Sequence, residues 1–167
     1  KPVLTVSIMP QKFLLEKIVG DKYDVHCLLA KGANPESYEP NMNHLMNLEK
    51  SRIFFCIGNL GFELAVKNKL RLNAPELQIV NCSEGIDLLK GTHSGMLHLG
   101  QECAHGHNHE IDPHVWTSVV NAMVIAENMY KTMLEYDTKN KKFYTKNYKI
   151  LMSELESLQK ELEQTLA

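Results

Sequence analysis

The opening stretch VLTVSIMPQKFLLEKIVGD, Val3 to Asp21, decides the fold. Its first residues form a short apolar run that is typical of a buried strand. Pro10 then stands where a helix begins and Gly20 where that helix ends, which is the usual placement of proline and glycine around a helix. The stretch therefore predicts a strand over residues 3–8, followed directly by a helix.

The same order of strand and helix recurs through the first 80 residues. Further strands are predicted by alternating or continuous apolar residues over the ranges 23–29, 53–57 and 77–80. A helix capped by Asn41 is expected between the second and third of the four strands, and one over residues 62–70 before the last.

This alternation predicts an α/β fold, with a four-stranded parallel sheet flanked by helices on both faces. Right-handed crossovers place the carboxyl ends of all the strands at one edge of the sheet. Ligands bind at that edge in open α/β sheets, so the loops after Leu29 and Gly58 are the first candidates for a site.

The pattern changes after Val80, since residues 83–111 lack a sustained period and are rich in Gly, His and Ser. A helix is expected from Asp112 and Pro113, and a second from about Thr138 to the last residue. The second helix has an apolar stripe that needs a cover, so we expect that it could support self-association. This stripe consists of Leu151, Leu155, Leu158 and Leu162.

Composition and charge exclude several classes of function. The formal net charge is -2, which gives no electrostatic basis for binding nucleic acid or anionic membranes. No apolar run approaches the ~18 residues that a membrane span needs. Because the chain opens almost inside a strand, we expect that its amino terminus has been trimmed. Cys27, Cys56 and Cys82 lie in apolar runs without CxxC spacing, and are expected to be small buried hydrophobic residues.

The stretch HSGMLHLGQECAHGHNHEIDPHVW, residues 93–116, holds six of the eight histidines. Neutral imidazole binds Zn²⁺, Cu²⁺ and Ni²⁺, and thiolate suits zinc, so Cys103 is a further candidate. Glycines within the stretch predict a flexible chelator of moderate affinity and loose selectivity, and the alternative is a solvated polar loop. The candidate accessory ligands are His93, His98, His105, His107 and His109.

His114 has a different setting, in the first turn of the helix that follows. Asp112 could cap that helix or accept a hydrogen bond from the His114 ring, which would fix its tautomer. The alternative for His114 is a capping or surface role. Glu36 and Glu39 lie in the loop at the ligand-binding edge, where a loop carboxylate is more often only solvated. His26 and His44 are isolated, and are expected to be structural or surface residues.

Four segments together resemble the zinc- and manganese-uptake solute-binding proteins of bacterial ABC transporters, the ZnuA/TroA-like or cluster A-I group. They are SIMPQKFLLEKIVGD, GANPESYEP, IFFCIGNLGFE, and the His-rich stretch that ends in DPHVW. The resemblance covers essentially the whole chain in the same order. It implies two α/β lobes joined by one long helix, with the metal between them. Residues 1–136 would be the amino-terminal lobe and 137–167 the start of the interlobe helix, with the carboxyl-terminal lobe absent from this chain.

The resemblance also implies the metal site. Glu36 stands where most members of the group have a histidine as the first ligand, and His114 matches the second ligand. The other ligands come from the carboxyl-terminal lobe. The His-rich loop, about residues 84–111, is typical of zinc-type members, so Zn²⁺ is the expected metal and Mn²⁺ the second choice. The expected partner is the transporter's membrane permease, and the expected location is periplasmic or lipid-anchored.

Three alternatives stay open at this point. A manganese- or iron-type receptor of the same group is favoured by the oxygen ligand of Glu36 and disfavoured by the His-rich loop. A metal-dependent hydrolase could use Glu36 or Glu39 as a base, but the sequence has no HExxH or comparable spacing. An adhesin is the third, since some relatives of the group are described as surface binders. The expected function, metal capture, makes and breaks no covalent bond.

Overall fold

The computed structural model describes residues 1–29, 33–34, 38–58, 60–85 and 118–166. A four-stranded sheet has the order β2-β1-β3-β4, and all three pairings are parallel. The predicted sheet is therefore confirmed. Its strands are β1 (Val3–Val6), β2 (Asp24–Cys27), β3 (Ile53–Cys56) and β4 (Gln78–Asn81).

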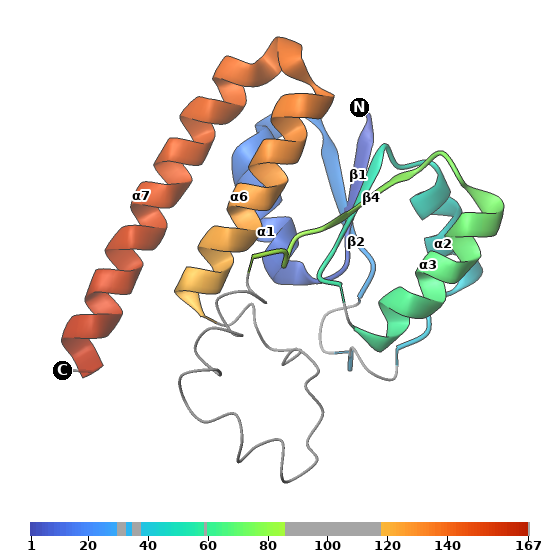
Figure 1. The fold of residues 1–167 in the computed structure, drawn as a ribbon, viewed down its shortest axis with the longest axis horizontal. Helices are drawn as coiled ribbons and strands as arrows, with labels where there is room; N and C mark the ends of the chain where they lie inside the picture. Colours follow the sequence, from blue (N-terminus) through green and yellow to red (C-terminus); the bar gives the residue numbers. More distant parts are fainter. Residues whose placement is uncertain (30–32, 35–37, 59, 86–117, 167) are drawn as a thin grey trace, which may run out of the picture.

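Helices cover both faces of this sheet, as Figure 1 shows, with α1, α6 and α7 on one side and α2 and α3 on the other. The longest helix, α7, packs against α1 and α6. Within the described residues, no helix has the length and apolar character that crossing a bilayer would require. The helices are α1 (Met9–Val19), η1 (Gly20–Lys22), α2 (Met42–Glu49), α3 (Gly61–Asn73), α6 (Val119–Tyr136), η3 (Thr138–Asn140) and α7 (Lys141–Leu166).

The two ends of α1 form as the sequence predicts. Pro10 lies in the first turn, where its missing N–H costs no helical hydrogen bond. Gly20 ends the helix with φ of 59°, a conformation that side chains disfavour, and its N–H donates to the carbonyl of Glu16. A Cβ at Gly20 would lie 2.8 Å from the Phe143 ring of α7. Gly20 therefore also allows α7 to approach the sheet layer.

The predicted first strand is two residues longer than the observed one, because Ser7 and Ile8 turn away into a polar contact. Their backbone N–H groups donate to the buried Gln11 side chain, each at 3.1 Å. The same amide donates from Nε2 to the Phe55 carbonyl of β3 at 3.1 Å. The strand therefore ends where the Gln11 side chain joins the backbone contacts of Ser7, whose N–H also donates to the Phe55 carbonyl at 3.2 Å.

The described cysteines are all free thiols. Cys56 and Cys82 are buried as predicted, whereas Cys27 on the edge strand β2 is half-buried, so the prediction for Cys27 was only partly right. Burial raises the pKa of the Cys27 thiol to about 11, and the thiol lies 3.5 Å from the Leu29 carbonyl. At neutral pH it is therefore protonated and has little nucleophilic character.

The leucine stripe of α7 is only half open. Leu151 and Leu155 are buried against the rest of the chain, while Leu158 and Leu162 are each 43% exposed. The sequence prediction treated all four as one uncovered surface, and that was wrong for the first two because α1 and α6 cover them. The structure thus removes half of the basis for self-association through this stripe.

A buried carboxylate joins α6 and α7 to the sheet layer. Tyr23, before β2, donates to Asp137 Oδ2 at 3.0 Å, Asn140 donates to the same oxygen at 2.8 Å, and Tyr144 of α7 also donates to it. Burial acts to raise the pKa of Asp137, but the three hydrogen bonds outweigh it and lower the pKa below its usual value. Burial and the bond to Asp137 raise the pKa of Tyr23 to about 12.

Because its pKa is lowered on folding, Asp137 stabilises the fold above the pKa of the unfolded state, and this contribution is lost as pH falls through the folded pKa. We expect Asp137→Asn to lower the free energy of unfolding by about 1–2 kcal/mol at pH 7. The difference from the parent should shrink towards zero at strongly acidic pH. Urea unfolding at several pH values measures both effects. The exposed Asp21→Asn is the matched control, and a pH-independent loss for Asp137→Asn would contradict the linkage.

Candidate metal site

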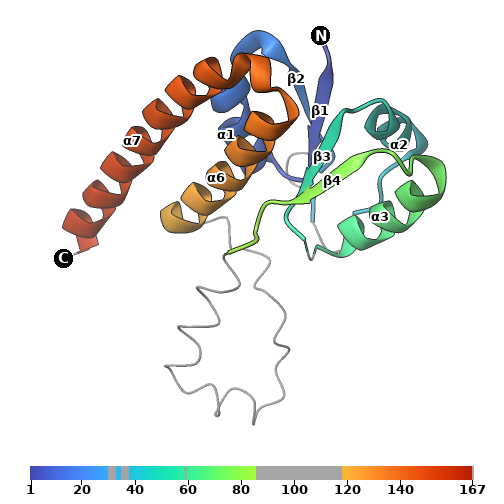
Figure 2. The same ribbon diagram turned by 45° about the horizontal axis from the view of Figure 1, so that its top comes forward.

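The carboxyl ends of the four strands lie at one edge of the sheet, away from the N-terminus, in both Figure 1 and Figure 2. The pairing of β2 continues past its end, since the N–H groups of Leu28 and Leu29 donate to Val6 and Ser7 carbonyls at 2.9 Å and 3.0 Å. Leu29 stands at the start of the loop that contains Glu36, and Gly85 precedes the segment 86–117 that contains the other predicted ligands. Both predicted segments therefore leave the described structure from this edge.

The turns at this edge are organised around one buried carboxylate, Glu63, which is 0% exposed. Its Oε2 accepts from the backbone N–H of Ile57 at 2.7 Å, and its Oε1 from the N–H groups of Gly58 at 2.8 Å and Leu60 at 3.3 Å. The hydroxyl of Ser7, at the end of β1, also donates to Oε2. Glu63 therefore fixes the turn between β3 and α3 and links it to the turn after β1.

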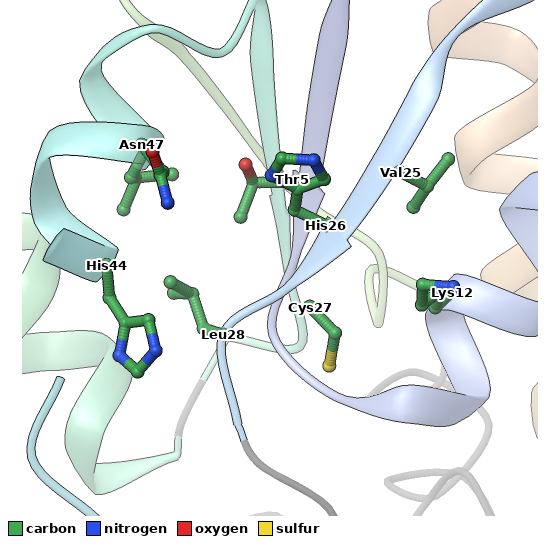
Figure 3. A pocket seen from close by; sticks show the side chains of 9 residues that line it. Thr5, Lys12, Val25, His26, Cys27, Leu28, His44 and Asn47 are labelled. Carbon is green, nitrogen blue, oxygen red and sulfur yellow. The ribbon is translucent and has the colours of Figure 1, made fainter.

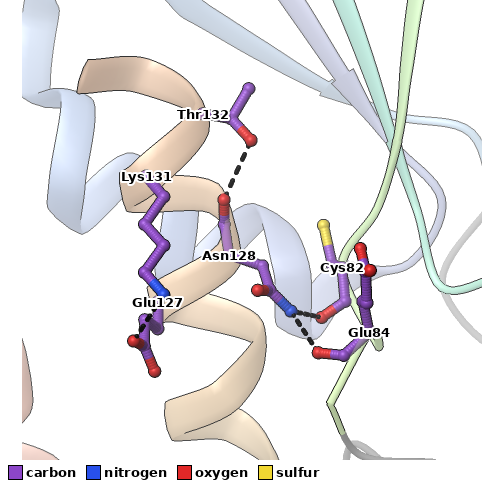
Figure 4. A network of polar contacts seen from close by, with 6 residues as sticks. All are labelled: Cys82, Glu84, Glu127, Asn128, Lys131 and Thr132. Carbon is purple, nitrogen blue, oxygen red and sulfur yellow. Dashed lines mark hydrogen bonds and ion pairs between the residues drawn. The ribbon is translucent and has the colours of Figure 1, made fainter. Parts of the chain in front are cut away.

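The residues that follow β4 are hydrogen-bonded to α6. Asn128 of α6 donates from Nδ2 to the Cys82 carbonyl at 2.7 Å and to the Glu84 carbonyl at 2.8 Å, as Figure 4 shows. A Cβ at Gly85 would lie 3.5 Å from Val124 of the same helix. Since α6 itself begins just after Ser118, both ends of the segment 86–117 join the described structure at α6.

The connection from β2 to α2 has its own fixed points. Asn41 caps α2 as predicted, accepting from the His44 N–H at 2.9 Å. His44 lies 2.7 Å from the hydroxyl of Tyr38, and Tyr38 lies 2.7 Å from the Leu28 carbonyl. His26 is exposed on β2 and lines a pocket of about 300 Å³ together with His44 and Leu28, shown in Figure 3. His26 and His44 thus have the surface and structural positions that were expected of them.

The predicted ligands themselves lie outside the described residues, so the structure does not test whether they meet. Within the described ranges, no group of three or more His, Cys, Asp or Glu side chains could hold a metal ion. The described part of the chain contains the sheet edge and the turns from which the ligand segments start. The undescribed candidates are Glu36, His93, His98, Cys103, His105, His107, His109, Asp112 and His114.

Sequence reasoning missed Glu63, Gln11 and Tyr38, the three side chains that organise this edge. A signal existed for Glu63, which stands three residues after the N-cap of α3, the position of the acidic residue in a capping box. Gln11 has the same signal, three residues after the N-cap Ile8 of α1, but its bond to the Phe55 carbonyl of β3 depends on a partner that only folding brings near.

Comparison with known proteins identifies the family of this chain. The profile of ZnuA, "zinc-uptake complex component A periplasmic", matches residues 4–167. The manganese ABC transporter substrate-binding lipoprotein PsaA of Streptococcus anginosus is 30% identical over an aligned length of 168 residues. The alignment covers 96% of this chain and 50% of PsaA. The iron ABC transporter substrate-binding lipoprotein MtsA of Streptococcus pyogenes serotype M1 is 31% identical, with 96% and 49% covered.

Solved structures agree. A crystal structure of ZnuA has a TM-score of 0.78 and 30% identity, covering 98% of this chain and 58% of that one. A zinc-bound deletion mutant of ZnuA has a TM-score of 0.78 and 28% identity, with 98% and 57% covered. The chain spans about half the length of the relatives that it matches.

The fold and these likenesses define the class of protein to which the chain is similar, the substrate-binding proteins of metal ABC transporters. Within that class, the chain belongs to the ZnuA family. The resemblance inferred from the sequence is therefore confirmed, and the group is an extracytoplasmic one of periplasmic proteins and lipoproteins. Its named relatives are substrate-binding lipoproteins of manganese and iron ABC transporters.

The Glu63 network makes a direct prediction. In Glu63→Gln the amide presents N–H groups to backbone donors, so at least one of the contacts to Ile57 or Gly58 must be lost. We expect the free energy of unfolding to fall by about 2–3 kcal/mol, the cost of leaving buried donors unsatisfied. Denaturant unfolding measures it, with the exposed Glu76→Gln as control. Equal stability of the two variants would show that the carboxylate does not hold the turns.

Proposed function

We propose that this chain captures Zn²⁺ outside the cytoplasmic membrane and that the protein it forms delivers the ion to an ABC permease. The observation that carries the proposal is the concentration of six of eight histidines in residues 93–116. That stretch lies in the segment whose two ends join α6 beside the carboxyl edge of the sheet. Membership of the family named for zinc uptake supports the same metal.

The proposed main-site ligands in this chain are Glu36 and His114, with Asp112 orienting the His114 ring. Two protein ligands leave two positions of a tetrahedral zinc site open, so this part of the site should bind zinc weakly by itself. We infer that residues 1–136 form the metal-binding lobe and that 137–167 begin a helix towards a second lobe with the other ligands. The accessory ligands are His93, His98, His105, His107 and His109, in a loop over about residues 84–111.

Zinc titration by calorimetry tests the two kinds of site. We expect deletion of residues 93–109 to remove most of the zinc bound, and His114→Ala in that deletion background to weaken the remaining site by at least about tenfold, or ~1.4 kcal/mol. Zinc binding should also fade as pH falls through ~6.5, because protonated imidazole cannot ligate. The exposed His26→Ala is the control. If His114→Ala changes nothing in the deletion background, the proposed main site is wrong.

A manganese- or iron-type receptor is the second candidate. It is supported by the printed names of relatives, which include a manganese and an iron lipoprotein, and by the oxygen ligand that Glu36 would supply. The His-rich stretch speaks against it, because imidazole suits zinc better than manganese.

Competition between Zn²⁺ and Mn²⁺ separates these candidates, measured through the paramagnetic signal of free Mn²⁺ in the chain lacking residues 93–109. Most protein sites bind Mn²⁺ more weakly than Zn²⁺. We expect that order here, with Zn²⁺ displacing Mn²⁺ stoichiometrically. Manganese binding as tight as zinc binding would reverse the intrinsic order and would identify a site built for manganese.

A further inference from the structure

Tyr38 holds the loop between β2 and α2 at four points. Its backbone N–H donates to the Asn34 carbonyl at 3.0 Å, so a hydrogen bond joins the residues on either side of 35–37. Its hydroxyl lies 2.7 Å from the Leu28 carbonyl and 2.7 Å from His44 Nδ1. Its ring packs edge-on against Phe62 with centroids 5.5 Å apart. Tyr38 therefore connects the end of β2, the loop and α2 through its side chain and its backbone.

The two short contacts of the hydroxyl determine where the protons lie. A tyrosine phenol has one proton to donate. The Leu28 carbonyl can only accept, so that proton goes to it, and His44 Nδ1 must then carry a proton and donate to Tyr38. In this tautomer Nδ1 does not accept from the Asn41 N–H, which lies 3.4 Å from it, whereas the Tyr38 hydroxyl lies at 2.7 Å.

His44 is therefore more than a cap residue of α2. It fixes the orientation of the Tyr38 hydroxyl, and through it the distance between the end of β2 and the start of α2. Figure 3 shows its ring and Leu28 among the side chains around the same pocket. Because the chain between Leu28 and Tyr38 is closed at both ends, less conformational entropy remains to be lost when a residue within it binds a ligand.

We propose that Tyr38 is the positioning residue for the metal-binding loop between β2 and α2, and that His44 acts through it. The inference rests on the proposed function, in which Glu36 of this loop is a metal ligand. Neither side chain touches the metal. Their effect is to hold the backbone on both sides of residues 35–37 before the metal arrives, which raises affinity by reducing the cost of ordering the loop.

The test measures zinc affinity and the rate of zinc release in the chain lacking residues 93–109. Tyr38→Phe keeps the ring against Phe62 and removes only the hydroxyl. We expect zinc affinity to fall about tenfold and zinc release to become correspondingly faster. His44→Ala should have a similar effect. His44→Asn should restore much of the affinity, because its Nδ2 takes the place of the His44 Nδ1 and can still donate to the Tyr38 hydroxyl.

Two control variants separate positioning from general stability. Tyr130→Phe removes a half-buried hydroxyl with a 2.9 Å hydrogen bond to Thr145, between α6 and α7, and should leave zinc binding unchanged. Asn41→Ala removes the cap of α2 but leaves the contacts of Tyr38, so it should reduce thermal stability more than zinc affinity.

The outcomes are distinguishable. Zinc binding that Tyr38→Phe leaves unchanged, or an equal loss of affinity in Asn41→Ala, would overturn the positioning role and leave the proposed function standing. If the parent lacking residues 93–109 binds no zinc at all, the proposed main site fails, and the positioning role fails with it. A tenfold loss in Tyr38→Phe and His44→Ala, with His44→Asn and Tyr130→Phe close to the parent, supports the role.

Discussion

The buried carboxylate of Glu63 is the constraint on which the ligand edge depends. An ionised carboxylate is costly to bury, and within the described residues no ion pair compensates it. Hydrogen bonds from three backbone N–H groups and the Ser7 hydroxyl offset that cost instead. These donors come from the two turns that follow β1 and β3. The central strands of the sheet are therefore held together at the edge from which the predicted ligand segments leave.

The opposite end of the sheet is fixed by the same kind of interaction. Asp137 accepts from Tyr23, Asn140 and Tyr144, and so binds the junction of α6 and α7 to the segment before β2. Further along α7, Asn147 donates to the Ile18 carbonyl of α1 at 3.0 Å. The direction of α7 relative to the sheet is thus set by buried polar contacts as well as by apolar packing. A long helix held in this way can transmit a fixed orientation to whatever packs against its far end.

The sequence predicted the elements of the fold well, because their signals are local. Pro10, Gly20 and Asn41 mark helix ends by their own backbone and side-chain chemistry, and continuous apolar runs mark buried strands. It did not predict the role of Glu63, although the capping-box position is a local signal, or that of Tyr38, whose ring partner Phe62 only the fold brings near. It also treated the α7 leucines as one surface, since a stripe does not reveal how far its neighbours extend.

The fold alone does not determine which metal a site of this family takes. Relatives named for manganese and for iron, and ZnuA structures, match this chain at about 30% identity over nearly its whole length. The sheet and its helices are therefore compatible with several metals. Selectivity must then come from the side chains that ligate and from the loops that hold them. In the proposed site of this chain the first ligand is a carboxylate, Glu36, and the chain also has a stretch with six histidines. An oxygen ligand would weaken the preference of such a site for zinc, so a loop that concentrates zinc would matter more here than in a protein with an all-histidine site.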